Sequence, residues 1–315
     1  MIRLQLSELA AALGCPAPDH DVGVEAIVTD SRKVDYGSLF AALPGSQVDG
    51  HDFADAAVRL GAVALLVSRR LDLEVPQLVV DNVLEALGSL ASLLRRRLDP
   101  VVVGITGSNG KTTVKEMVAS ILRLEGPVLA TEGNYNNELG LPLTLFRLQP
   151  KHRFAVLEMG ASKLHDIAYL AGIGRPDVGL VNNIAPAHLE GFGSIEGVAR
   201  TKGEMFGALP ANGCAVMNAD EPWGELWREQ NAAEKVLTFG AAADADVRVE
   251  ATADGCRLIT TAGACDVVLP LPGSHNHMNA AAATAVALVL DDSINWLSTL
   301  TTVSSSWRSP PRSWL

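Results

Sequence analysis

Residues 104–113, Gly-Ile-Thr-Gly-Ser-Asn-Gly-Lys-Thr-Thr, combine the residue types that bind phosphate. The three glycines allow the backbone to approach a phosphate group closely, and Lys111 supplies an opposing charge. The apolar run 101–105 predicts a strand before the loop, and residues 114–122 repeat apolar side chains at helical spacing after it. Lys111 and Thr112 therefore fall at a helix N-terminus, where unpaired backbone N–H groups favour an anion.

In such a loop, Lys111 would neutralise the outer phosphates of a nucleotide and the Thr112 hydroxyl would reach Mg²⁺. The spacing differs from the standard GxxxxGK pattern, which needs a glycine at position 105, where Ile105 stands. The plainer alternative is a glycine-rich turn between a strand and a helix with an exposed lysine. We predict nucleotide contacts from Gly107, Ser108, Asn109, Gly110, Lys111, Thr112 and Thr113.

Strands that alternate with helices are expected to position this loop. The apolar segments 154–160, 178–184 and 214–220 each predict a strand, with helical patterning between them. This alternation predicts an α/β fold whose central domain is a mostly parallel sheet with right-handed crossovers. We expect a small N-terminal α/β domain over 1–82, a central nucleotide-binding domain over 83–290, and an aberrant tail over 291–315.

Composition excludes several classes of protein. The 315 residues carry a formal net charge of −11, which argues against general binding to nucleic acid or to a membrane surface. Four scattered cysteines, Cys15, Cys214, Cys256 and Cys265, support neither a disulfide framework nor a CxxC metal site. No signal peptide and no apolar run of membrane-spanning length are present, so we expect a cytoplasmic protein without membrane insertion.

Two polar residues follow predicted strands. Glu158 ends the apolar strand 154–158, and His188 comes after the strand 178–184. Carboxyl ends of parallel strands share one edge of a sheet, where the phosphate loop also emerges, so both are candidates for a ligand site. Each residue alone is equally well explained as ordinary loop polarity.

Several motifs along the chain together resemble the Mur ligase family, whose ATP loop reads GxxGxNGK followed by Ser or Thr. They occur in family order, and similarity extends over about residues 25–290. The motifs are TDSRKVDYGSLFAALPGSQVDGHDF (29–53), GNYNNELGLPLTL (133–145), VLEMGAS (156–162), NNIAPAHLEGFGS (182–194), KGEMF (202–206) and GSHNHMNAAAA (273–283). Within the family, the match is most similar to the ligases that use D-Ala-D-Ala.

The resemblance implies an ATP- and Mg²⁺-dependent ligase of peptidoglycan precursor synthesis, acting as a monomer. ATP would phosphorylate the terminal carboxylate of UDP-MurNAc-tripeptide, and the amine of D-Ala-D-Ala would attack the acyl phosphate. It also implies that Thr112 and Glu158 bind one Mg²⁺, while His188 and a carbamylated Lys202 bind a second. Catalytic roles would fall to Lys111, Lys202 and His188. Without the resemblance, Lys202 is a solvated lysine of an amphipathic helix.

The resemblance assigns further residues to the substrates. Asn276 and Asn279 would contact adenine, although asparagine at a helix start is ordinarily a cap. Asn137 and Glu138 would lie near ATP and the muramyl substrate. Asp30, Ser31 and Arg32 would hold the uridine diphosphate, with Arg32 as a forked phosphate donor; a capped turn with a surface arginine is the alternative.

The tail 291–315 departs from the family. It holds three of the five tryptophans and seven serines, without strand or helix periodicity, where the family has a third domain. We hypothesise a lost reading frame near residue 291 and expect binding without efficient ligation. Two alternatives remain: a sister amide ligase, such as the meso-diaminopimelate-adding or folylpolyglutamate type, and a fragment that only binds nucleotide or UDP-sugar.

Overall fold

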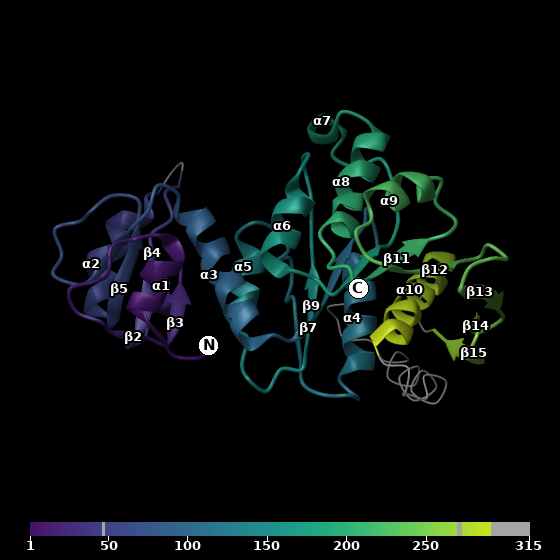
Figure 1. Cartoon of the computed structure of the whole chain (residues 1–315), viewed down its shortest axis with the longest axis horizontal. Helices are drawn as coiled ribbons and strands as arrows, with labels where there is room; N and C mark the ends of the chain where they lie inside the picture. The colour runs from purple at the N-terminus through teal and green to yellow at the C-terminus, as the bar shows by residue number, and fades with distance from the viewer. Residues whose placement is uncertain (46–47, 270–272, 291–315) are drawn as a thin grey trace. The chain divides into compact units, whose positions relative to one another are not determined.

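A computed structural model describes residues 1–45, 48–269 and 273–290. The tail 291–315, for which the sequence analysis hypothesised a lost reading frame, lies outside the described residues. The chain divides into two compact units. Among the described residues, the first contains those of 1–99 and 138–150, and the second contains those of 100–137 and 151–290 (Figure 1).

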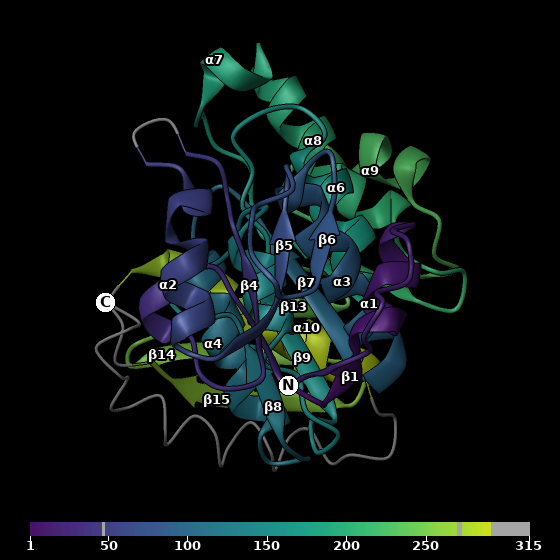
Figure 2. The same ribbon diagram turned by 90° about the vertical axis from the view of Figure 1, so that its left-hand side faces the viewer.

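The first unit is built on a four-stranded parallel sheet in the order β3-β4-β5-β6. Helix α2 packs beside β5 on the face that carries Phe40 and Leu65 (Figure 2). Its elements are β1 (Leu4–Gln5), α1 (Leu6–Leu13), β2 (Gly23–Val24), β3 (Ala26–Val28), η1 (Ser31–Lys33), β4 (Ser38–Ala41), η2 (Gly50–Phe53), α2 (Ala54–Arg59), β5 (Ala62–Val67), β6 (Gln77–Val79), α3 (Val83–Leu98) and α5 (Gly140–Leu145).

Helix α3 belongs to the first unit and not to the second. The sequence analysis assigned residues 83–98 to the central domain, whereas the first compact unit extends to Asp99. Asn82 caps the helix by accepting from the Leu84 and Glu85 amides, and α3 buries its apolar side chains against α1 and α5. The apolar face of α3 therefore completes the core of the first unit.

The second unit is built on a nine-stranded sheet in the order β15-β14-β13-β12-β11-β10-β7-β9-β8. Its elements are β7 (Val101–Thr106), α4 (Lys111–Leu122), β8 (Val128–Ala130), β9 (Phe154–Glu158), α6 (Asp166–Gly174), β10 (Val178–Val181), α7 (Leu189–Phe192), α8 (Ile195–Gly207), β11 (Cys214–Asn218), α9 (Gly224–Gln230), β12 (Lys235–Gly240), β13 (Val247–Thr252), β14 (Gly255–Thr260), β15 (Gly263–Val268) and α10 (Ser274–Leu290).

The register of this sheet confirms the predicted α/β class. All pairs from β8 to β13 are parallel, including β7 with β9 and with β10. The antiparallel meander of β13, β14 and β15 was not predicted. Every residue of β9 and β10 is buried, as expected for parallel strands covered on both faces.

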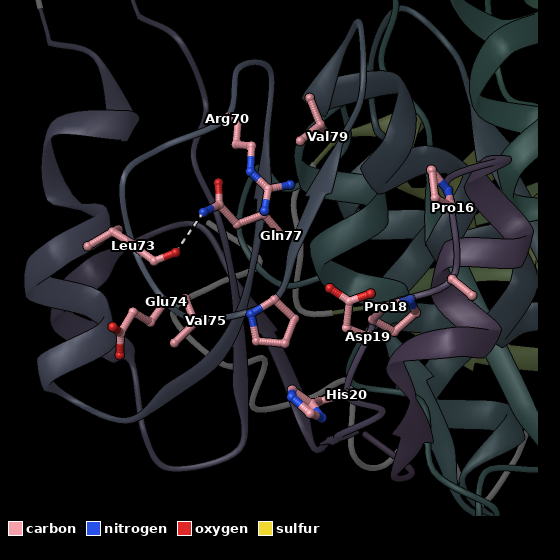
Figure 3. Close-up of a pocket in the computed structure, with 12 residues that line it drawn as sticks. Pro16, Pro18, Asp19, His20, Arg70, Leu73, Glu74, Val75, Gln77 and Val79 are labelled. Atoms are coloured by element: carbon pink, nitrogen blue, oxygen red, sulfur yellow. Dashed lines mark hydrogen bonds between the residues drawn. The ribbon is translucent and has the colours of Figure 1, made fainter.

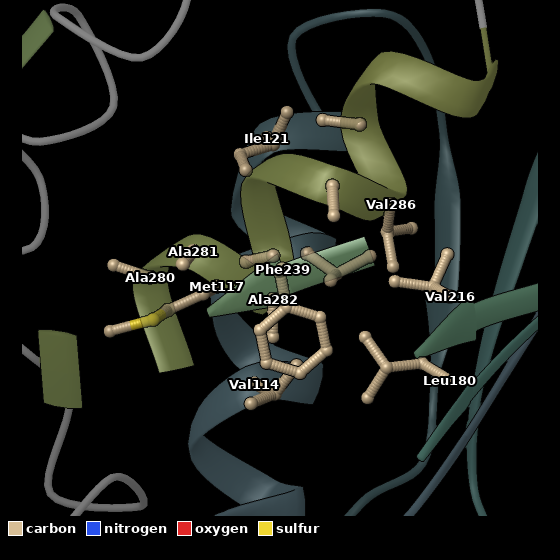
Figure 4. Packing of buried hydrophobic residues seen from close by; sticks show 14 of the residues in the cluster. Val114, Met117, Ile121, Leu180, Val216, Phe239, Ala280, Ala281, Ala282 and Val286 are labelled. Atoms are coloured by element: carbon tan, nitrogen blue, oxygen red, sulfur yellow. The ribbon is translucent and has the colours of Figure 1, made fainter. Parts of the chain in front are cut away.

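Helices α4 and α10 lie side by side over one face of the nine-stranded sheet (Figure 1). Figure 4 shows Ala280, Ala281 and Ala282 of α10 in the same buried cluster as Val114 and Met117 of α4. The small alanine side chains allow the two helix backbones to approach closely. This packing fixes the helix that begins at Lys111, directly after the phosphate-loop residues. None of the helices within the described ranges is long and apolar enough to cross a lipid bilayer.

Candidate nucleotide site

The loop 107–110 connects the end of β7 with the start of α4. Gly107 and Gly110 have φ angles of +152° and +75°, which residues with a side chain rarely adopt. Gly110 also has no room for a side chain, because a Cβ there would lie 2.6 Å from Asn279 Oδ1 and 2.8 Å from Asn182 Nδ2. The glycine spacing seen in the sequence is therefore a requirement of both backbone conformation and close packing.

Lys111 lies back over this loop. Its Nζ donates to the carbonyl oxygens of Gly107 at 2.9 Å and Ser108 at 3.3 Å. Burial lowers the pKa of the Lys111 ammonium, and the negative charge of Glu158 opposes part of that shift. A cation held against the loop at a helix N-terminus creates a site for anionic oxygens.

The segment after β10 holds the loop in place. The amides of Ser108 and Asn109 donate to the carbonyl and side-chain oxygens of Asn183, at 2.9 and 2.8 Å. Asn182 Nδ2 donates to the Asn109 carbonyl at 3.0 Å, and Ser108 Oγ donates to the Ala185 carbonyl at 3.1 Å. The sequence analysis missed Asn182 and Asn183, although a pair of asparagines directly after a buried strand was an available signal.

Thr112 and Glu158, which the resemblance assigned to one Mg²⁺, are in direct contact. Thr112 Oγ1 donates to Glu158 Oε2 at 2.8 Å, and Glu158 is only 2% exposed. The second carboxylate oxygen, Oε1, accepts from Asn136 Nδ2 at 2.7 Å. A hydroxyl and a carboxylate together form a hard-oxygen donor set of the kind Mg²⁺ prefers, so these residues fit a magnesium ion.

Lys202 is not the solvated helix lysine that its sequence context alone suggested. Lys202 lies on α8 and is only 4% exposed to solvent. Burial and the neighbouring Lys111 charge lower the pKa of its ammonium to about 8. Within the described ranges, the Lys202 ammonium forms no hydrogen bond or ion pair with another residue. Both effects disfavour the charged form, so the fraction of neutral amine near pH 7 is larger than for an ordinary lysine.

His188 lies in a different environment. It is exposed and precedes α7 with a left-handed φ of 51°, where its carbonyl accepts from Gly191 and Phe192 amides. No described contact joins its imidazole to Glu158 or Lys202. In residues 1–45, 48–269 and 273–290, no three His, Cys, Asp or Glu side chains gather to hold a metal ion. The second-metal role of His188 remains a prediction.

Asn276 and Asn279 open α10 and are both buried. Asn279 Oδ1 accepts from Asn182 Nδ2 at 2.9 Å, and its Nδ2 donates to Asn276 Oδ1 at 3.1 Å. Both polar groups of Asn279 therefore bond within the protein, next to the phosphate loop. The geometry assigns Asn279 a supporting role for the loop, and adenine contact remains a prediction for both asparagines.

The remaining predicted substrate residues are Asn137 and Glu138, together with Asp30, Ser31 and Arg32 of the first unit. Asn137 and Glu138 are exposed, and it is the preceding Asn136, missed by the sequence analysis, that bonds Glu158. Arg32 is paired with Asp30, its Nε donating to Oδ1 at 2.9 Å and its Nη2 to Oδ2 at 2.8 Å. This pairing lowers the pKa of Asp30 to about 2. Ser31, which lies between these two residues, is the first residue of the short helix η1.

The first unit also contains a cavity of about 400 Å³ between the segments 16–20 and 70–79 (Figure 3). Pro16, Pro18, His20 and Arg70 are among its lining residues, and most of its lining is exposed. It contains none of the predicted site residues. Its charged side chains have mixed signs, so the cavity favours no single ligand class.

Comparisons with known proteins decide the family. A model of the Mur ligase middle domain matches residues 105–287, and a model of the Mur ligase family catalytic domain matches residues 23–95. The chain belongs to the Mur ligase family. The phosphate loop, Glu158 and Lys202 all lie within the matched middle domain.

Individual Mur ligases are also similar over most of the chain. The UDP-N-acetylmuramoyl-tripeptide–D-alanyl-D-alanine ligase of Escherichia coli is 47% identical over 294 residues, covering 91% of this chain and 65% of that ligase. A crystal structure of MurF from Acinetobacter baumannii has a TM-score of 0.87 at 34% identity, covering 95% of this chain and 68% of that one. MurF from Thermotoga maritima, solved in complex with ADP, has a TM-score of 0.79 at 31% identity, covering 87% and 65%.

Proposed function

We propose that this Mur ligase chain belongs to an ATP-dependent ligase that joins D-Ala-D-Ala to the terminal carboxylate of UDP-MurNAc-tripeptide. The similarity to ligases of that name and to an ADP-bound relative supports the proposal. The chain spans 65% of the length of the E. coli relative. The observation that carries the proposal is the meeting of Lys111, Thr112 and Glu158 at one helix N-terminus.

The residues of the second unit have distinct roles in this proposal. The first amides of α4 and the Lys111 ammonium would bind the β- and γ-phosphates of ATP, and Lys111 would stabilise charge on the transferred phosphoryl group. Thr112 and Glu158 would hold Mg²⁺, which supplies charge neutralisation to the phosphates when bound. The substrate carboxylate would take the phosphoryl group, and the dipeptide amine would then displace phosphate to form the amide.

We further infer that Lys202 carries a carbamate in the active enzyme. With a pKa of about 8, roughly a tenth of the amine is neutral at pH 7, and the neutral amine is the form that attacks CO₂. Carbamylation replaces a cation beside Lys111 with an anion, which removes the repulsion between two buried ammonium groups. The resulting oxygens suit a hard divalent cation.

Calorimetric titration of the chain with ADP and Mg²⁺ tests the nucleotide site. We expect saturable binding to one site, and weaker binding by at least tenfold for Lys111→Ala. Lys163→Ala serves as the control because Lys163 is an exposed lysine of the same unit, outside the phosphate loop. Equal affinity of the parent and Lys111→Ala for ADP would refute the assignment of the loop.

A further inference from the structure

Lys115 is a buried lysine that the proposed mechanism does not use. It lies three residues after Thr112 on α4 and is 1% exposed. Its Nζ donates to the Thr131 carbonyl at 2.6 Å and forms an ion pair with Glu116 Oε1 at 2.9 Å. Burial of an ammonium is unfavourable unless its donors are satisfied, so these two contacts determine where it can lie.

Thr131 connects this lysine to Glu158. The Thr131 hydroxyl oxygen accepts from the Glu158 amide at 3.0 Å, and the Thr131 amide donates to the Val156 carbonyl at 3.0 Å. Thr131 is buried beside the last residues of β9. The Lys115 ammonium therefore fixes the Thr131 carbonyl group, and the Thr131 hydroxyl in turn fixes the backbone amide of Glu158.

The same segment also reaches the Glu158 carboxylate. Five residues after Thr131, Asn136 donates to Glu158 Oε1, and its carbonyl accepts from the Gly160 amide at 2.8 Å. The other carboxylate oxygen accepts from Thr112, which is on the same helix as Lys115. A closed circuit of hydrogen bonds thus runs from α4 through the 131–136 segment to Glu158 and back to α4.

We propose that Lys115 is a positioning residue that holds the 131–136 segment, and through it the Glu158 carboxylate, in the orientation that binds a divalent cation. This inference rests on the proposed magnesium site of Thr112 and Glu158. Stability alone does not require the charge, since apolar replacement of buried ion pairs is often neutral or stabilising. Groups that orient a metal-binding carboxylate through hydrogen bonds typically change metal affinity by about 10–100-fold when removed.

The test measures the dissociation constant of ADP with Mg²⁺ and with EDTA, for the parent and for Lys115→Met. Methionine has a similar length but no donor. We expect the strengthening of ADP binding by Mg²⁺ to fall about tenfold or more in Lys115→Met, while affinity in EDTA stays within about twofold. Glu116→Gln is the matched control, because it removes the negative charge, keeps an oxygen that can accept from Lys115, and leaves the Lys115–Thr131 hydrogen bond. This control should keep the Mg²⁺ effect of the parent.

A Mg²⁺ effect in Lys115→Met equal to that of the parent would overturn the inference. So would equal losses of affinity with Mg²⁺ and with EDTA, which indicate a role in folding alone. If Lys115→Met does not fold, Thr131→Val decides, because it keeps the side-chain shape and removes the acceptor of the Glu158 amide; the same selective loss is expected. A parent chain that binds ADP without any Mg²⁺ effect would instead refute the proposed metal site, and the inference with it.

Discussion

Substitution of Gly110 by alanine perturbs the phosphate loop at its most restricted position. The residue has a φ of +75°, and an added Cβ would lie 2.6 Å from Asn279 Oδ1 and 2.8 Å from Asn182 Nδ2. Left-handed backbone costs a residue with a side chain about 1–2 kcal/mol. The clash also displaces Asn182 from its hydrogen bonds to the Asn109 carbonyl and Asn279.

Each of those two hydrogen bonds contributes about 0.5–1.5 kcal/mol, so the total penalty is about 2–5 kcal/mol. Because about 1.4 kcal/mol corresponds to a tenfold change, ADP binding should weaken by about 30-fold or more if the loop must keep its present shape to bind phosphate. Calorimetric titration with ADP and Mg²⁺ measures this change, and circular dichroism checks the fold of the variant.

Gly14→Ala is the matched control for backbone strain. Gly14 has a φ of +66°, and a Cβ there would meet nothing within 4 Å. It terminates α1 in the first unit, so we expect a loss of about 1–2 kcal/mol in stability and parental ADP binding. If Gly110→Ala binds ADP as tightly as Gly14→Ala does, the close packing between the loop and the two asparagines has no role in nucleotide binding.

Three further predictions concern single charges. Lys111→Ala should weaken ADP binding by roughly 10- to 150-fold, the contribution of a hydrogen bond to a charged group, with little change in the unfolding curve. The Lys202 pKa is about 8 when folded against 10.5 ordinarily, so the unfolded chain binds more protons between these values and stability should rise with pH across them. The free energy of unfolding should rise by on the order of 3 kcal/mol over this pH range. Urea unfolding without CO₂ or metal measures this rise, which should be absent in Lys202→Met. Arg32→Ala should weaken binding of the UDP-linked precursor about tenfold without destabilising the fold, because the Arg32 side chain is 87% exposed; unchanged precursor affinity in titration would contradict that role.

The phosphate loop and the parallel sheet were predictable from the sequence because their signals are local. The glycine spacing lies between an apolar run and a helical repeat, and all three signals fall within residues 101–122. Glu158 likewise ends its own buried strand. The rule that parallel strands share a carboxyl edge placed Glu158 beside the phosphate loop that leads into Thr112. That prediction is confirmed by their 2.8 Å hydrogen bond.

The supporting residues were less predictable because their roles depend on contacts distant in the sequence. Asn182 bonds Asn279 across 97 positions, and no local pattern indicates that pairing. Lys202 has the amphipathic context of a surface lysine, and only the packing of α8 buries it. The burial of Lys115 was predictable from the sequence, because Lys115 shares a helix face with the apolar residues Val118 and Leu122, three and seven positions later.

Amide formation tests the proposed function most directly. The assay uses a chimera in which this chain replaces the matching 65% of the E. coli ligase. With ATP, Mg²⁺ and UDP-MurNAc-tripeptide, we predict a product with the mass of the D-Ala-D-Ala adduct, and equal amounts of ADP and phosphate. Omission of the dipeptide, its replacement by meso-diaminopimelate, or Lys111→Ala should remove the product. Absence of the D-Ala-D-Ala adduct from a chimera that binds both ADP and the precursor, or undiminished product with Lys111→Ala, would contradict the proposal.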